Sequence, residues 1–137
     1  MKPPTDRELM LEAQRARLSA YAPYSHFFVG AALLAASGKV YLGCNIENAA
    51  YGPTNCAERT AFFKAVSEGE RSFAAIAITG GGGEDPNTLC APCGVCRQVM
   101  AEFCDGAFRV ILGTPAAVEV HTLQDLLPLS FGKSDLA

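Results

Sequence analysis

The sequence lacks the features that mark two large classes of protein. No apolar run approaches the roughly 18 residues that a membrane span needs, although half of the 137 residues are hydrophobic. No cluster of lysine and arginine is present, and 11 basic residues against 14 acidic ones leave a net charge of −3. Proteins that hold a phosphate backbone usually carry such a cluster. We therefore expect neither a membrane nor a nucleic-acid partner.

Further absences narrow the chemistry and the compartment. His26 and His121 have no partner at metal-ligand spacing, and no triad-like constellation accompanies Ser25. The polar amino terminus has no apolar signal segment, so we expect a cytoplasmic protein. A length of 137 residues fits a single domain, residues 1–137, that can bury a core without disulfides.

Six cysteines are present, and three of them form an informative pattern. Cys93 and Cys96 make a Cys-x-x-Cys pair after Pro92, while Cys56 lies far upstream with Glu58 two residues after it. A structural zinc site usually has four protein ligands, whereas a catalytic zinc ion has three protein ligands and one open coordination position. Three thiols and one neighbouring carboxylate therefore favour one catalytic Zn²⁺, with Glu58 beside the metal. The order is typical of zinc enzymes that deaminate nucleobases.

Cys90 allows a different interpretation of the same segment. With Cys56 or Cys104 it would complete four thiols, as in a closed Cys₄ zinc site or an iron–sulfur cluster. Such a non-enzymatic module has no use for Glu58, and the proline before Cys93 suits the first turn of a helix that leaves Cys90 outside. We therefore treat Cys90 as a spectator and keep the closed module as an alternative.

Both cysteine segments are predicted to begin helices, with Cys56, Cys93 and Cys96 in the first turns. Cysteine must be deprotonated to bind zinc, and the positive end of a helix dipole favours the thiolate. Three thiolates and Zn²⁺ sum to a charge of −1. Arg59, three residues after Cys56, is placed to donate hydrogen bonds to the sulfurs and offset that charge.

Hydrophobic periodicity and turn residues predict an α/β fold, a three-layer sandwich built on a mixed five-stranded sheet. The glycine run 80–83, with residues 84–87, is predicted to be a mobile loop. The four-residue link 113–116 is too short for a parallel crossover, so the last two strands should form an antiparallel hairpin. The predicted elements are a helix from Thr5 to near Tyr21, strands 27–35 and 40–45, a helix 56–66 capped by Asn55, a strand 73–79, a helix from 92 or 93 to 103, strands 108–112 and 117–121, and a helical turn 124–127.

Motifs spread over nearly the whole chain carry a resemblance to one known family. The chain closely resembles the small homotetrameric cytidine deaminases that act on free nucleosides, and the resemblance implies their fold. The motifs are segment 21–25, Phe27 with 29–32, segments 43–49, 56–61 and 92–99, and Leu126-Leu127-Pro128 with Phe131.

The resemblance implies a reaction and its substrate contacts. The chain would convert cytidine and 2′-deoxycytidine to uridine and 2′-deoxyuridine, releasing ammonia, with one Zn²⁺ per chain and Glu58 as acid and base. Phe27 would stack on the pyrimidine, and the backbone at Ala57 would contact the base. Asn45 and Glu47 would hydrogen-bond the ribose 3′-hydroxyl.

The resemblance also implies an assembly. Tyr51 and Phe131 resemble residues that reach a neighbouring subunit's site, so we expect a homotetramer with composite active sites. A same-fold deaminase of a modified cytosine nucleoside stays open as an alternative. An enzyme that edits RNA or DNA is disfavoured by the negative charge and by the predicted hairpin.

Overall fold

The structure, a computed structural model, describes residues 2–83 and 89–136. Its centre is a mixed five-stranded sheet in the order β2-β1-β3-β4-β5. Strands β3 and β4 run parallel, and the other neighbouring pairs are antiparallel. The β4–β5 hairpin confirms the direction predicted from its short link. The strands are β1 (Phe28–Ala35), β2 (Val40–Cys44), β3 (Phe73–Gly81), β4 (Arg109–Thr114) and β5 (Ala117–Thr122).

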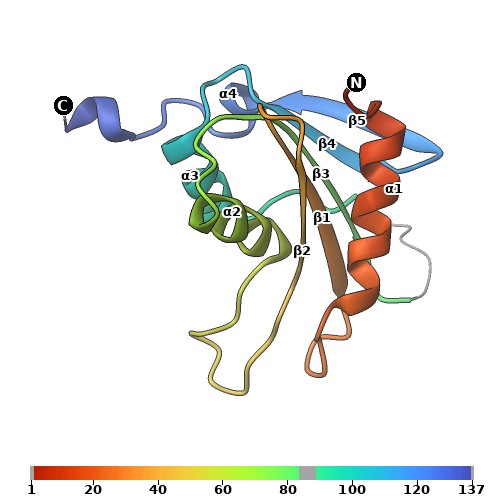
Figure 1. The fold of residues 1–137 in the computed structure, drawn as a ribbon. Coiled ribbons are helices and arrows are strands. Elements are labelled where there is room, and N and C mark those ends of the chain that lie inside the picture. The colour runs from red at the N-terminus through yellow and green to blue at the C-terminus, as the bar shows by residue number, and fades with distance from the viewer. Residues whose placement is uncertain (1, 84–88, 137) are drawn as a thin grey trace.

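Helices cover both faces of the sheet (Figure 1). Helix α1 (Asp6–Ala16) lies on one face, and α2 (Ala57–Ser67) with α3 (Gly94–Phe103) lies on the other. A short α4 (Leu123–Leu126) follows β5. This arrangement confirms the predicted three-layer α/β sandwich and the predicted order of its elements. None of the helices in the described ranges is long and apolar enough to cross a membrane.

Strand β1 shows why helices are needed on both faces. Ala31 and Leu33 belong to a buried cluster that contains Phe62 of α2, whereas Ala32 and Leu34 belong to a second cluster under α1. Consecutive side chains of a strand point to opposite faces of the sheet. A strand that is apolar at every position must therefore be covered on both sides.

Two glycines let the helices approach the sheet closely. A Cβ atom at Gly30 would lie 2.0 Å from the carbonyl oxygen of Ala13 in α1, and one at Gly43 would lie 2.3 Å from that of Ala57 in α2. No other residue fits at these contacts without moving a helix. Because Ala57 directly precedes Glu58, Gly43 brings the start of α2 against β2.

Two strands end two residues later than predicted, and the other strand ends agree with the prediction to within one residue. Gly80 and Gly81 pair with Val29 and Phe28 of β1, so the first two of the four glycines belong to the strand. Residues 84–87 of the predicted loop lie outside the described residues. Strand β4 extends to Thr114, which pairs with Ala117, and this leaves a two-residue turn instead of a four-residue link. In both places, pairing with a neighbouring strand extends the element.

Helix α1 begins as predicted. The Glu8 backbone N–H donates to the Thr5 hydroxyl at 3.1 Å, and the Thr5 N–H donates to the Glu8 carboxylate at 2.9 Å. This capping box satisfies two N–H groups that the helix itself leaves free. The α-helix ends at Ala16 and continues as a 3₁₀ turn to Ser19, close to the predicted end near Tyr21.

Candidate zinc site and substrate pocket

Three cysteine thiols meet where α2 and α3 begin. Cys56 and Cys93 are the N-cap residues of the two helices, and Cys96 lies in the first turn of α3. Their Sγ atoms all lie within 4.8 Å of one another, with Cys56–Cys93 at 3.8 Å and Cys93–Cys96 at 3.4 Å. Tetrahedral Zn–S bonds of about 2.3 Å place sulfurs roughly 3.8 Å apart. The donor set and its spacing therefore fit one Zn²⁺.

The two caps correct the predicted helix starts by one residue. Asn55, the predicted cap, exchanges backbone hydrogen bonds of 2.9 Å with Ile46 in both directions, which keeps the chain extended as far as Cys56. Neither Cys56 nor Cys93 makes a side-chain capping bond within the described part of the chain. The positive ends of both helix dipoles are therefore available to stabilise thiolates.

Arg59 lies beside the cluster, as its spacing from Cys56 predicted. Its Nη2 donates to the Cys56 Sγ at 3.2 Å, and its buried Nε has no hydrogen-bond partner among the described residues. Hydrogen bonds from Cys96 and from Arg59 lower the pKa of Cys56. The guanidinium thus places a positive charge against a group of sulfurs that would be negative with zinc bound.

Glu58 is the buried acidic residue of the site. It lies in the first turn of α2, next to Cys56 and Arg59, and is 4% exposed. Burial raises the pKa of its carboxyl group to about 7. A carboxyl group shielded from water is costly to ionise, so burial favours the protonated form of Glu58 more than it would that of an exposed glutamate. It is not part of the three-sulfur group.

A pocket of about 300 Å³ lies beside the thiols. It brings together residues that come before β1, after β2, at the start of α2 and before α3. Two predicted ligands and four predicted substrate contacts line it together with Glu58. The lining is Ser25, Phe27, Val29, Asn45, Glu47, Thr54, Asn55, Cys56, Ala57, Glu58, Cys90, Ala91 and Cys93.

Asn45 fixes the chain that carries Phe27. Its Oδ1 accepts the Val29 N–H at 2.8 Å, and its Nδ2 donates to the Phe27 carbonyl oxygen at 2.8 Å. Both bonds run from the end of β2 to the beginning of β1. The side-chain amide therefore sets the position of Phe27 in the pocket wall.

Glu47 holds the loop that precedes Phe27. Its Oε1 accepts the backbone N–H groups of Tyr24 at 3.0 Å and of Ser25 at 3.1 Å, and its Oε2 accepts the Ser25 hydroxyl. The Ser25 oxygen in turn accepts the Phe27 N–H at 3.1 Å. These bonds, that of the Ser25 hydroxyl foremost, lower the pKa of Glu47. The result is an ionised acceptor fixed at the pocket.

Sequence reasoning missed Ser25 as a pocket residue. A serine without triad partners gives no sign of a role, yet Ser25 links Glu47 to the backbone of Phe27. The available signal was its place in segment 21–25, one of the motifs of the resemblance.

Tyr51 and Phe131 lie apart from the other expected contacts. Neither is among the described residues that line the pocket of their own chain. Tyr51 is 81% exposed and lines a neighbouring hollow of about 340 Å³ that also includes Ser25, Glu47 and Thr54. Phe131 is 60% exposed and follows α4 in the C-terminal segment.

Cys90 lines the pocket but lies outside the thiol cluster. Within residues 2–83 and 89–136, the group close enough to share a metal is Cys56, Cys93 and Cys96. Burial raises the pKa of Cys90 to about 12, which keeps it a neutral thiol. Burial likewise raises the pKa of Cys104 to about 12. The described chain therefore gathers three thiols, and a closed four-thiol site is not formed.

Comparison with known proteins agrees with this geometry. Residues 3–114 match the family described as "Cytidine and deoxycytidylate deaminase zinc-binding region". A protein named "Cytidine deaminase" from Sporosarcina psychrophila is 54% identical over 131 residues, which cover 95% of this chain and 93% of that protein. The chain belongs to the cytidine and deoxycytidylate deaminase family. All three thiols and Glu58 lie inside the span that matches this zinc-binding family.

Other similar members agree along the whole fold. A "Cytidine deaminase" from Halalkalibacterium halodurans is 50% identical over 133 residues, covering 96% of this chain and 98% of that protein. The crystal structure of cytidine deaminase from Burkholderia pseudomallei superposes with a TM-score of 0.85 at 49% identity, covering 93% of this chain and 99% of that one. The deaminase fold is therefore shared over nearly the whole chain.

Proposed function

We propose that this deaminase-family protein is a hydrolase that converts cytidine and 2′-deoxycytidine to uridine and 2′-deoxyuridine with release of ammonia, as in pyrimidine salvage. One observation carries the proposal. A buried carboxyl group, Glu58, shares a pocket with a three-thiol zinc site and with Phe27, Asn45 and Glu47. The relatives named for cytidine deamination support the same substrate class.

The three cysteines would be the metal ligands. Cys56, Cys93 and Cys96 would hold Zn²⁺ and leave its fourth position free. When bound, zinc supplies a water molecule that is activated at neutral pH. Arg59 donates to the Cys56 sulfur and so draws negative charge away from the ligand set. This favours a more strongly polarising metal than three unassisted thiolates would give.

Glu58 would carry the protons of the reaction. Its carboxylate accepts a proton from the attacking water and delivers it to N3 of the base. The oxygen of that water adds to C4, and Glu58 is again a carboxylate. It then takes the remaining proton from the new hydroxyl at C4 and passes it to the amine, so that the C4–N bond breaks, ammonia leaves and a carbonyl remains at C4. One group can act twice because it lies beside the ligands and is not one of them. Its 4% exposure limits exchange of these protons with solvent.

Phe27, Asn45 and Glu47 would select the nucleoside. The Phe27 ring offers an aromatic face for a pyrimidine. The Glu47 carboxylate already accepts three hydrogen bonds of the roughly four that its lone pairs allow, so it can accept one more from a ribose 3′-hydroxyl. Its negative charge disfavours a phosphate at that position. A nucleoside with a free 3′-hydroxyl therefore fits this contact.

We also infer a homotetramer with composite active sites in the cytoplasm. Tyr51 and Phe131 expose 81% and 60% of their surfaces, and large aromatic side chains are enriched at interfaces. The six cysteines are all free, which supports a reducing compartment.

Metal analysis combined with an ultraviolet assay on cytidine tests the proposal. We expect a colourless protein with about one zinc per chain that forms equal amounts of uridine and ammonia. An iron–sulfur charge-transfer band, or zinc-loaded protein that leaves cytidine and 2′-deoxycytidine unchanged, would refute it. Faster turnover of a modified cytosine nucleoside would favour the alternative substrate.

A further inference from the structure

Helix α3 contacts the C-terminal segment directly after its metal-binding turn. Arg97 and Gln98 follow Cys96, and both donate side-chain hydrogen bonds outside the helix. Arg97 Nε donates to the Pro92 carbonyl oxygen at 2.7 Å, and its Nη1 donates to that of Leu126 at 2.6 Å. Gln98 Nε2 donates to the carbonyl oxygen of Phe131 at 2.7 Å.

The C-terminal arm, residues 127–136, extends past α3 and away from the sheet (Figure 1). Leu129 is fully exposed and has a φ of 51°, so the backbone bends there through the left-handed region. A hollow of about 350 Å³ is lined by arm residues and by Ala101 and Cys104 near the end of α3. The arm is therefore packed loosely on its own subunit. The position of the arm therefore depends more on its hydrogen bonds to α3 than on its packing contacts.

We propose that Gln98 is a positioning residue for Phe131, and that Arg97 ties the base of the same arm to the loop before Cys93. This inference rests on the proposed composite site, in which Phe131 completes the pocket of a neighbouring subunit. Gln98 bonds the backbone of Phe131 itself. It fixes the point from which the ring projects without touching the ring.

Arg97 extends the link to the metal-binding loop. Its planar guanidinium donates in two fixed directions, to the carbonyl before Cys93 and to the last residue of α4. One bond of Arg97 therefore fixes the loop that carries Cys93, and the other fixes the point where the arm begins. A single turn of α3 thus sets two ligands of its own zinc site and an aromatic wall of the neighbour's pocket.

The Gln98→Met variant tests the position of the arm, because it keeps the length of the side chain and removes its donor. We expect zinc content and the tetramer to be retained and KM for cytidine to rise roughly three- to tenfold, the effect of one lost hydrogen bond. Misfolding would lower the amount of active enzyme, and so kcat, without this rise in KM. Hydrogen exchange at residues 129–133 should become faster.

Glu102→Gln is the matched control. Glu102 lies on α3 one turn beyond Gln98, is exposed, and makes no side-chain hydrogen bond with any described residue. We expect this variant to keep the wild-type KM and the wild-type exchange rates. A wild-type KM and unchanged exchange in Gln98→Met would overturn the role proposed for Gln98.

Hybrid tetramers show on which site Gln98 acts. Gln98→Met chains are co-expressed with inactive Glu58→Ala chains that carry a different tag, and the mixed tetramers are purified. Sites with a native Glu58 then receive some arms that are held by a native Gln98, and part of the activity should return to the wild-type KM. If KM stays fully raised, Gln98 acts within its own pocket and the proposal is wrong.

A parallel hybrid of Phe131→Ala with Glu58→Ala chains separates the possible failures. A partial return to the wild-type KM in this hybrid supports the composite site, so a negative Gln98 result would then refute only the positioning role. A KM that stays fully raised in this hybrid refutes the composite site and the role of Gln98 with it. Wild-type protein that fails to deaminate cytidine refutes the proposed function itself.

Discussion

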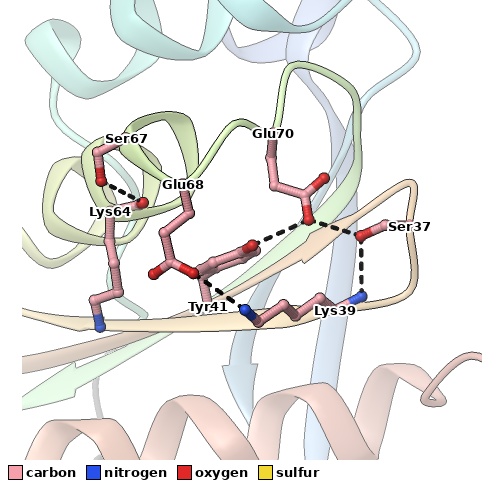
Figure 2. Close-up of polar contacts among 7 residues, drawn as sticks. All are labelled: Ser37, Lys39, Tyr41, Lys64, Ser67, Glu68 and Glu70. Atoms are coloured by element: carbon pink, nitrogen blue, oxygen red, sulfur yellow. Dashed lines mark hydrogen bonds and ion pairs between the residues drawn. The ribbon is translucent and has the colours of Figure 1, made fainter.

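Helix α2 carries ionisable groups at both of its ends, in opposite surroundings. At the N-terminal end, Glu58 is 4% exposed beside thiols and Arg59. At the other end, Figure 2 shows Glu68 and Glu70 meeting the turn between β1 and β2. The second group contains only ordinary pairs: Lys39 with Glu68 at 3.1 Å, and the hydroxyls of Ser37 and Tyr41 donating to Glu70 at 2.7 and 3.0 Å.

The contrast indicates that the group at the N-terminal end is a functional site and that the group at the C-terminal end is structural. The carboxylates near Tyr41 have ordinary partners, the Lys39 ammonium group for Glu68 and two hydroxyls for Glu70, and their loss would weaken one corner of the fold. Burying the Glu58 carboxyl group costs folding free energy, and such a cost is typical of functional sites. Substitutions at the two ends should therefore affect different measurements: chemistry at the N-terminal end and thermal stability at the C-terminal end.

The largest effect is expected at the ligands. Cys93→Ala should abolish zinc binding and activity together, because two thiols cannot hold zinc as three do. Cys90→Ala is the matched control, and it should keep about one zinc per chain and most of its turnover. Metal analysis and the cytidine assay measure both quantities. Loss of zinc from the Cys90 variant would revive the four-thiol interpretation.

Glu58→Gln should remove the chemistry and spare the metal. We expect kcat to fall by at least ~10²–10⁴, the contribution of one acid–base group, and by more because the same carboxyl serves several transfers. Zinc content and melting temperature should remain near their wild-type values. Near-normal turnover would show that another group carries the protons.

Phe131→Ala tests whether a residue from a neighbouring subunit completes the pocket at the N-terminal end of α2. The variant should raise KM by about tenfold through loss of aromatic contact, while zinc and fold are retained. In mixed tetramers with Glu58→Ala chains, part of the activity should return to the wild-type KM, because sites with a native Glu58 then receive a native Phe131. Sedimentation provides the opposing outcome, since a fully active monomer excludes the shared site.

The smallest effect is expected at the other end of the helix. Tyr41→Phe removes the hydroxyl that donates to Glu70 and should lower the melting temperature by only a few degrees. The kcat/KM for cytidine should not change. A clear loss of activity here, measured on fully folded protein, would show that the two ends of α2 are coupled.

Local patterns were sufficient for much of this site. The spacing of Cys56, Cys93 and Cys96 predicts their shared metal, since helix starts favour thiolates and i, i+3 residues share a face. The length of link 113–116 predicts the hairpin. In each case the deciding physics lies within a few neighbouring residues.

The missed features depend on distant partners. The start of α2 moved because Asn55 pairs with Ile46, and β3 lengthened because β1 offers partners for Gly80 and Gly81. The bond from Ser25 to Glu47 spans 22 residues. No local propensity encodes these pairings, since each exists only after the strands have assembled.

The placement of the thiols on two helices has a consequence for folding. Cys56 and Cys93 are 37 residues apart, and β3 lies between them in the chain. A bound ion would therefore cross-link the two ends of a chain segment that contains the central strand, as a disulfide bond does. A cross-link of that span restricts the unfolded chain by roughly 4 kcal/mol in the loop-entropy picture. In this protein the metal would stabilise the fold as well as take part in the chemistry. Removing it with a chelator should destabilise the contact between the starts of α2 and α3 before it affects the rest of the sheet.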